Sequence, residues 1–268
     1  MGEQAVTVSG RQLRVRIRPG TAAGPPLVLC NGIGARLEVL EPLVSRLRPE
    51  RTVITFDVPG VGESPTPPRP YTVRGLARLL AELLTRLGFG EIDVLGYSWG
   101  GGLAQQFAVQ YPRRARRMVL ACTGTGMLMV PGHPRVLSRM LTSRRHHDPE
   151  YAASVAADLY GGSMRTNPEL ARGVLGGRHD QPRNVGYLYQ LGALLTWTSL
   201  PWLWAVRQPT LLIFGDDDPL IPLANGYLMN AVLPHGELYT FHGGHLDPVL
   251  LAPQIAGEID RFLSRATP

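Results

Sequence analysis

The pentapeptide Gly96-Tyr97-Ser98-Trp99-Gly100 restricts the fold more than any other part of the chain. It follows an apolar run at 92–95 and precedes a segment whose apolar residues recur at helical spacing. A strand that turns sharply into a helix at a serine exposes the hydroxyl at the apex of the bend, with the helix N-terminus behind it. The glycines two residues before and after let strand and helix approach closely. The pattern therefore predicts that Ser98 is a nucleophile.

Short apolar runs alternate with segments of helical periodicity on both sides of this motif. The runs that predict strands are 27–30, 53–56, 92–95, 118–121, 210–214 and 237–241. The segments that predict helices are 36–47, 72–87, a helix ending at 110 and a last helix ending at 263. This alternation favours an α/β fold, with a mostly parallel sheet covered by helices on both faces. A site on such a sheet lies at the carboxyl ends of its strands.

Residues 124–208 interrupt this alternation and carry three of the four tryptophans, Trp197, Trp202 and Trp204. A helix-prone, aromatic insertion of this size after a core strand predicts a helical cap over the site. The predicted division is an α/β core in two parts, 1–123 and 209–268, with the cap at 124–208. The three tryptophans are candidates for binding an apolar substrate, although for any single one a place in the cap's own core is the more favoured interpretation.

A histidine and acids follow the serine in an informative order. Three acids at 216–218 follow the strand at 210–214, and His242 and His245 follow the last strand. The order serine, acid, histidine is the one expected on an α/β-hydrolase sheet. Asp218 is favoured over Asp217 because its Gly-x-x-Asp-x-x-x-Pro frame places it where strand turns into loop. His245 is favoured over His242 because the glycines before it let the loop carry it inward.

These residue types suit hydrolysis by a covalent route. A neutral imidazole must take the serine proton during attack, and a carboxylate must hold that imidazole in the right tautomer. The main-chain N–H groups of Trp99 and Ile33 are the expected oxyanion hole, since Ile33 lies in a glycine-containing turn after the strand at 27–30. No cofactor and no metal enters this scheme.

Composition excludes several other classes of protein. All 27 basic residues are arginine, against 21 acids, but they are scattered along the chain, so no nucleic-acid partner is expected. Cys30 and Cys122 each follow an apolar run and predict buried thiols rather than a disulfide framework. No run reaches the roughly 18 apolar residues that a membrane span needs. No signal peptide is evident, and a cytoplasmic location is expected.

The chain resembles α/β-hydrolase-fold serine esterases and, among them, the intracellular medium-chain-length poly(3-hydroxyalkanoate) depolymerases. The core motifs that carry the resemblance are Asn31-Gly32-Ile33-Gly34-Ala35, the stretch 56–62, Ser98-Trp99-Gly100-Gly101, the stretch 103–108 and the stretch 215–222. The cap motifs are Tyr160-Gly161-Gly162-Ser163 and Trp197-Thr198-Ser199. The core motifs belong to the whole superfamily, so the cap motifs carry most of the weight for this family.

The resemblance implies hydrolysis of stored poly(3-hydroxyalkanoate) at the granule surface by Ser98, Asp218 and His245, with release of 3-hydroxy acids. The chain departs from the family pattern at Tyr97, where a small apolar residue is usual, and at Glu63, where glycine is usual. It also departs beside the histidine, where Gly243 and Asp247 stand in place of an acid and an apolar residue.

Two alternatives remain open at this point. One is a hydrolase of small soluble esters or lactones, or of carbon-carbon bonds, on the same fold. The other is a non-catalytic binding protein that keeps the fold as a ligand pocket. The aromatic cap favours a polymer substrate, and the three competent residue types at the predicted site disfavour the non-catalytic protein.

Overall fold

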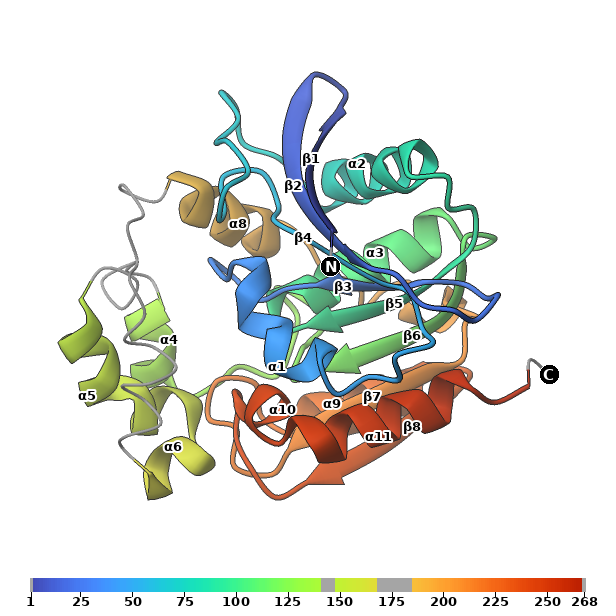
Figure 1. The fold of residues 1–268 in the computed structure, drawn as a ribbon. Helices are drawn as coiled ribbons and strands as arrows, with labels where there is room; N and C mark the ends of the chain where they lie inside the picture. Colours follow the sequence, from blue (N-terminus) through green and yellow to red (C-terminus); the bar gives the residue numbers. More distant parts are fainter. Residues whose placement is uncertain (1, 141–147, 168–184, 267–268) are drawn as a thin grey trace.

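A computed structural model describes residues 2–140, 148–167 and 185–266 of the chain. The described residues form one eight-stranded sheet with the order β1-β2-β4-β3-β5-β6-β7-β8 (Figure 1). The strands are β1 (Gly2–Val8), β2 (Arg11–Arg18), β3 (Leu27–Cys30), β4 (Val53–Phe56), β5 (Ile92–Tyr97), β6 (Ala115–Ala121), β7 (Thr210–Gly215) and β8 (Gly236–Phe241). The α/β architecture expected from the alternation of runs is therefore present.

The sheet is parallel from β4 to β8, and β2 runs antiparallel to both β1 and β4. The alternation of arginine with apolar residues over 11–18 predicts one strand in the first twenty residues, and the structure has a hairpin there. Ser9 and Gly10 form its turn with φ angles of 48° and 71°. Glu3 on β1 is tied to Arg14 and Arg16 on β2, and these two guanidinium groups hold the pKa of Glu3 down at about 2.

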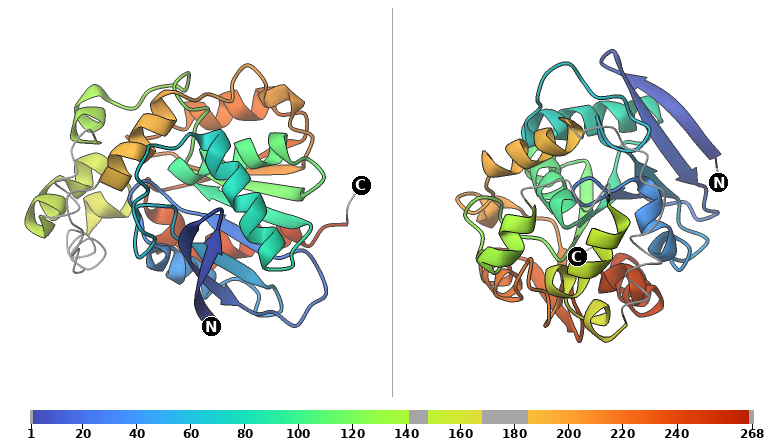
Figure 2. Two further views of the ribbon diagram at one scale, coloured as in Figure 1. Left: turned by 90° about the horizontal axis from the view of Figure 1, so that it is seen from above. Right: turned by 90° about the vertical axis from the view of Figure 1, so that its left-hand side faces the viewer.

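Helices cover both faces of the sheet, and Figure 2 shows the layers from above. One face carries α2 (Val73–Arg86), α3 (Trp99–Gln110) and α9 (Ala224–Val232). The other face carries α1 (Glu41–Val44), α10 (Asp247–Leu250) and α11 (Ala252–Leu263). The predicted helix at 36–47 is shorter than expected, because a 3-10 turn, η1 (Leu37–Leu40), precedes the single turn of α1.

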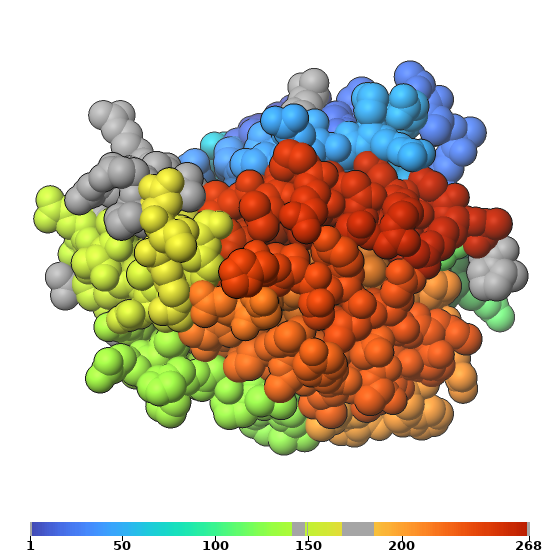
Figure 3. All heavy atoms as spheres, turned by 90° about the horizontal axis from the view of Figure 1, so that it is seen from below, coloured from blue at the N-terminus to red at the C-terminus, as the bar shows by residue number. Residues whose placement is uncertain are grey.

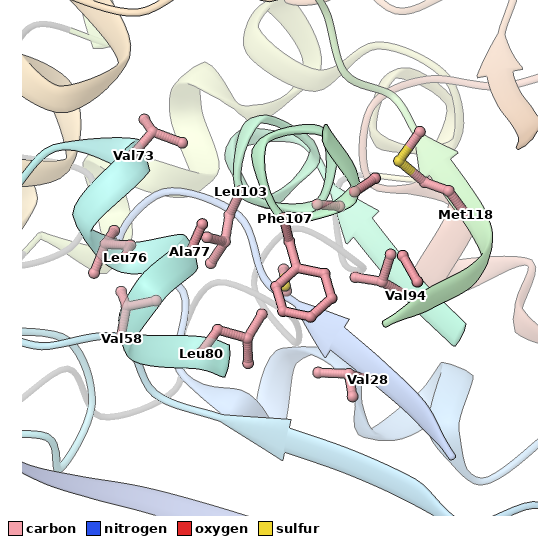
Figure 4. Close-up of a cluster of buried hydrophobic side chains, with 14 of the residues drawn as sticks. Val28, Val58, Val73, Leu76, Ala77, Leu80, Val94, Leu103, Phe107 and Met118 are labelled. Atoms are coloured by element: carbon pink, nitrogen blue, oxygen red, sulfur yellow. The ribbon is translucent and has the colours of Figure 1, made fainter. Parts of the chain in front are cut away.

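Each face buries its own hydrophobic core. On the α2/α3 face, Leu80, Leu103 and Phe107 pack over Val28 and Val94 of the sheet (Figure 4). On the opposite face, α1 and α11 contact each other and pack over the other side chains of the same strands. Figure 3 shows this face from outside, with the red atoms of the C-terminal residues beside blue atoms of an N-terminal segment. Burial on both faces explains why the central strands read as continuous apolar runs rather than as alternating patterns.

Between β6 and β7 the chain forms further helices beyond the carboxyl ends of the strands (Figure 1). They are α4 (Pro134–Met140), α5 (Pro149–Tyr160), α6 (Ser163–Thr166) and α8 (Val185–Leu195). The 3-10 turn η3 (Leu203–Ala205) follows them and contacts α9. Trp197, Leu203 and Val206 near the end of this stretch belong to the core on the α2/α3 face. The last part of residues 124–208 thus packs with the sheet and not only with the cap helices.

No helix among residues 2–140, 148–167 and 185–266 combines the length and the apolar character that crossing a bilayer requires.

Candidate active site

Ser98 stands at the sharp turn between β5 and α3. Its backbone has φ 53° and ψ −121°, a sparsely populated conformation that costs on the order of 1–3 kcal/mol. Three hydrogen bonds hold this conformation. The N–H of Ser98 donates to the carbonyl of Ala121 at 2.9 Å, and the carbonyl of Ser98 accepts from the N–H of Gly101 at 2.9 Å and from the hydroxyl of Thr123 at 2.7 Å. The side chain is left half-buried at the end of the sheet.

The flanking glycines are needed because the turn leaves no room for a side chain. A Cβ on Gly96 would lie 2.5 Å from the Cα of Gly101, and a Cβ on Gly100 would lie 2.1 Å from the carbonyl oxygen of Cys30. Both distances are well inside van der Waals contact. The close approach of strand and helix expected from the sequence is therefore present at both positions.

His245 lies between Ser98 and Asp218. Its Nε2 is 2.9 Å from the Ser98 hydroxyl, and its Nδ1 is 2.7 Å from Oδ2 of Asp218. A carboxylate can only accept, so Nδ1 carries the proton and Nε2 is free to accept from the serine. The other Asp218 oxygen accepts from the N–H groups of Leu220 and Ile221, each at 2.9 Å. The imidazole is thus held in the tautomer that can take the serine proton.

The rejected candidates lie elsewhere. Asp217 accepts from the N–H of Gly162 at 2.7 Å and from the guanidinium of Arg165 at 2.9 Å. His242 is exposed and pairs with Asp216 at 3.1 Å, and this carboxylate raises the pKa of the His242 ring. Of these neighbouring acids and histidines, the structure brings only Asp218 and His245 to Ser98.

The turn after β3 lies beside the serine, as the oxyanion-hole prediction requires. A Cβ on Gly32 would be 3.5 Å from the Cβ of Ser98. Asn31 shapes this turn by accepting from the N–H of Gly32 at 2.8 Å and donating to the carbonyl of Arg36 at 2.7 Å. Within the described part of the chain, no group accepts a hydrogen bond from the N–H of Ile33 or of Trp99. These two N–H groups therefore remain available to a ligand.

Two tyrosines that the sequence analysis did not assign to the site hold His245 in place. The Tyr97 hydroxyl donates to the carbonyl of His245 at 2.6 Å, and burial raises the pKa of Tyr97 well above its usual range, so it stays a donor. The carbonyl of Tyr160 in the cap accepts from the N–H of His245 at 2.7 Å. The two rings stack near the imidazole, with centroid distances of 5.6 Å for Tyr97 and 6.3 Å for Tyr160.

Asp247 joins the histidine loop to the cap. Its Oδ2 accepts from the N–H of Gly244 at 2.6 Å and from the N–H of Ser163 at 3.1 Å. A Cβ on Gly162 would lie 2.0 Å from the same oxygen and 2.1 Å from the Gly244 nitrogen. Asp247, which departs from the family pattern, thus links two loops. Only the departure itself marked Tyr97 and Asp247 in the sequence.

The three tryptophans proposed as substrate-binding residues have other partners. The Trp197 indole donates to Gln106 on α3 at 2.8 Å and packs edge-on against Trp202, with ring centroids 5.8 Å apart. Trp204 is 59% exposed, and its indole donates to the carbonyl of Pro201 at 3.1 Å. Of the described hydrogen bonds and ring contacts of Ser98 and His245, none involves these tryptophans. Trp197 is buried in the core on the α2/α3 face, and Trp202 packs against that core, whereas the interpretation favoured from the sequence was the cap's own core.

One group of potential metal ligands occurs in the described residues. The Cys122 thiol, Asp218 and His245 offer ligand atoms within 4.8 Å of one another. Both Asp218 oxygens and both imidazole nitrogens already have hydrogen-bond partners. Burial raises the pKa of the Cys122 thiol well above its usual range, so the thiolate that would bind a metal is disfavoured. The chemistry of these donors suits the hydrogen bonds in place better than a metal.

Comparison with known proteins places this geometry in a family. Residues 25–250 match the family described as alpha/beta hydrolase fold. The chain belongs to this family. A poly(3-hydroxyalkanoate) depolymerase from Ectopseudomonas oleovorans is 44% identical over 262 residues, which cover 98% of this chain and 92% of that protein. The resemblance inferred from the sequence, and with it the prediction of an ester hydrolase of the alpha/beta hydrolase fold, are confirmed.

More distant relatives share the fold. The 3-oxoadipate enol-lactonase 2 of Acinetobacter baylyi is 26% identical over 234 residues, which cover 86% of this chain and 85% of that protein. Among solved structures, a hydrolase from Pseudomonas aeruginosa PA01 has a TM-score of 0.81 and 26% identity, covering 98% of this chain and 99% of that chain. The alpha/beta hydrolase architecture thus extends over nearly the whole chain.

Proposed function

We propose that this alpha/beta hydrolase cleaves the ester bonds of poly(3-hydroxyalkanoate), of medium side-chain length, through an acyl-enzyme on Ser98. The observation that carries the proposal is the pair of hydrogen bonds at His245, 2.9 Å to Ser98 and 2.7 Å to Asp218. The relative from Ectopseudomonas oleovorans, named a poly(3-hydroxyalkanoate) depolymerase, supports the substrate.

In acylation, the Ser98 oxygen forms a bond to the ester carbonyl carbon while its proton moves to Nε2 of His245. Asp218 stabilises the resulting imidazolium. The negative charge on the carbonyl oxygen is bound by the N–H groups of Ile33 and Trp99, with the N-terminus of α3 behind them. When the carbon-oxygen bond to the departing chain breaks, His245 gives its proton to that alcohol oxygen.

In deacylation, water replaces the alcohol. His245 takes a proton from the water as the water oxygen attacks the acyl carbon, and returns it to Ser98 when the acyl-oxygen bond breaks. The same two N–H groups bind the second oxyanion. A shortened polymer end, or a free 3-hydroxy acid, leaves, and the serine is regenerated.

A hydrophobic polyester as substrate is supported by apolar side chains on the outside of the cap. Leu188 and Leu195 of α8 are seven residues apart, which is two helical turns, and they are 59% and 53% exposed. Met127, which is 60% exposed, donates its N–H to the carbonyl of Trp197, two residues after Leu195. We define Met127, Leu188 and Leu195 as the cap apolar surface. Such a surface suits contact with a polymer granule in the cytoplasm.

The test compares two substrates for the wild-type enzyme and Ser98→Ala. We expect the wild-type enzyme to clear a latex of medium-chain-length poly(3-hydroxyalkanoate), and Ser98→Ala to clear none. Hydrolysis of a soluble p-nitrophenyl ester without any clearing would contradict the polymer assignment. It would favour the small-ester or lactone alternative, to which the enol-lactonase of Acinetobacter baylyi lends support.

A further inference from the structure

Gln190 on the cap helix α8 contacts both halves of the proposed oxyanion hole. Its side-chain Oε1 accepts from the N–H of Gly34 at 2.7 Å, and its main-chain carbonyl accepts from the indole N–H of Trp99 at 2.8 Å. Gln190 is only 1% exposed. Gly34 directly follows Ile33 in the turn after β3, and Trp99 directly follows Ser98. One cap residue thus reaches the two segments that supply the oxyanion donors.

The bond to Gly34 constrains the direction of the Ile33 amide. A hydrogen bond on the N–H of Gly34 fixes the Ile33–Gly34 peptide plane, and Gly34 has a φ of 67°, in the left-handed region. This plane meets, at the Cα of Ile33, the Gly32–Ile33 peptide that carries the Ile33 N–H, so fixing the first limits how far the second can rotate. With the Gly34 N–H turned toward Gln190, the N–H left without a described partner in this turn is that of Ile33. Loss of the acceptor would free the turn to rotate, and an oxyanion donor is effective only when it is already aimed at the developing charge.

We propose that Gln190 is the positioning residue of the oxyanion hole, through whose side chain the cap sets the direction of the Ile33 donor. This inference rests on the proposed function, because the hole matters only if Ser98 acylates. The core then supplies the oxyanion donors, and the cap supplies the acceptor that holds the turn after β3 in position. A buried amide with this role would be expected to affect the transition state much more than substrate binding.

The test uses Gln190→Met, which keeps the side-chain length and removes the acceptor, with Gln208→Met as matched control. Gln208 is also buried and donates to the carbonyls of Ala108 and Pro112. It lies just before the amino end of β7, whereas the site is at the carboxyl ends of the strands. On a soluble p-nitrophenyl ester we expect Gln190→Met to lower kcat by about tenfold or more, somewhat less than the loss of a whole donor, with KM changed by less than about threefold. Gln208→Met should keep kcat within about twofold. A kcat for Gln190→Met no lower than that of Gln208→Met would overturn the proposal.

A second measurement does not need activity. Amide hydrogen exchange of Gly34, followed by NMR, should be slow in the wild-type enzyme, faster in Gln190→Met, and slow again in Gln190→Glu, which retains an acceptor oxygen. Equal exchange in the wild-type enzyme and Gln190→Met would overturn the role of Gln190, whatever the activity. Slow Gly34 exchange in a wild-type enzyme that hydrolyses no ester would instead count against the proposed function alone. If Gln190→Met does not fold, the wild-type and Gln190→Glu exchange rates decide, because fast exchange in both means no such hydrogen bond.

Discussion

Asp218 and Asp217 are adjacent in the chain but have different partners, so their loss should have different effects. Asp218→Asn removes the carboxylate that holds the His245 tautomer, and we expect kcat on a soluble ester to fall by about 10³ to 10⁴-fold. Asp217→Asn is the matched control, because Asp217 bonds to Gly162 and Arg165 and not to His245. Steady-state kinetics of the two variants provide the measurement. A comparable loss in Asp217→Asn would contradict the assignment.

Tyr97→Phe should destabilise the fold as well as the site, because it leaves the buried carbonyl of His245 without its donor. We expect the free energy of unfolding, measured by urea denaturation, to fall by about 1–3 kcal/mol, together with a loss in kcat. Tyr71→Phe is the control, since the Tyr71 hydroxyl reaches its acceptor, the carbonyl of Gly186, only at 3.5 Å. Equal losses of unfolding free energy and of kcat in the two variants would mean that the hydrogen bond from the Tyr97 hydroxyl contributes nothing beyond the packing of its ring.

Among single residues, the sequence indicates those that are marked by their neighbours in the chain. It does not indicate those that bond to main-chain groups of segments far away in the chain. Ser98 is marked by its own glycines, and Asp218 and His245 by the strands that they follow. Gln190, Tyr97 and Asp247 bond to backbone groups of segments far along the chain, so no spacing predicts them. The aromatic types at Trp197 and Trp202 indicate burial. They do not indicate that these side chains pack on the α2/α3 face of the sheet rather than in the cap's own core.

Among the elements, the junction of β5 and α3 is the least tolerant of added volume. Gly100→Ala places a methyl group against the carbonyl of Cys30, and we expect a loss of about 1–3 kcal/mol or more in the free energy of unfolding, with loss of activity. Gly257→Ala on α11 has open space around its Cβ and should stabilise the protein by about 0.5–1 kcal/mol. Thermal unfolding of both variants tests the contrast. A Gly100→Ala protein as stable as the wild type would contradict the packing described.

The helices and strands that the sequence predicts are those whose burial produces a regular pattern of apolar residues. The central strands are buried on both faces and appear as apolar runs, and α2 shows a clear amphipathic period. The sequence pattern predicts one strand where the structure has the hairpin of β1 and β2, because the edge position leaves most of β1 exposed and without an apolar run. The segment at 36–47 has helical spacing, but its helix breaks into η1 and α1.

On the scale of the molecule, the cap presents apolar side chains outward while it packs against the site inward. Replacement of Leu188 and Leu195 together by serine should lower the rate of polymer latex clearing severalfold. The rate on a soluble p-nitrophenyl ester should fall much less, because neither side chain is buried. The ratio of the two rates is the measurement. A proportional fall in both would mean that the cap apolar surface plays no part in contact with the polymer.

The covalent role proposed for Ser98 can be tested directly by incubating the enzyme with a serine-reactive phosphonate and recording the mass of the intact chain and of its peptides. The account predicts one adduct per chain, on the peptide that contains Ser98, with no adduct in Ser98→Ala and much slower labelling in His245→Ala. An unlabelled wild-type chain, or an adduct that persists in Ser98→Ala, would contradict it.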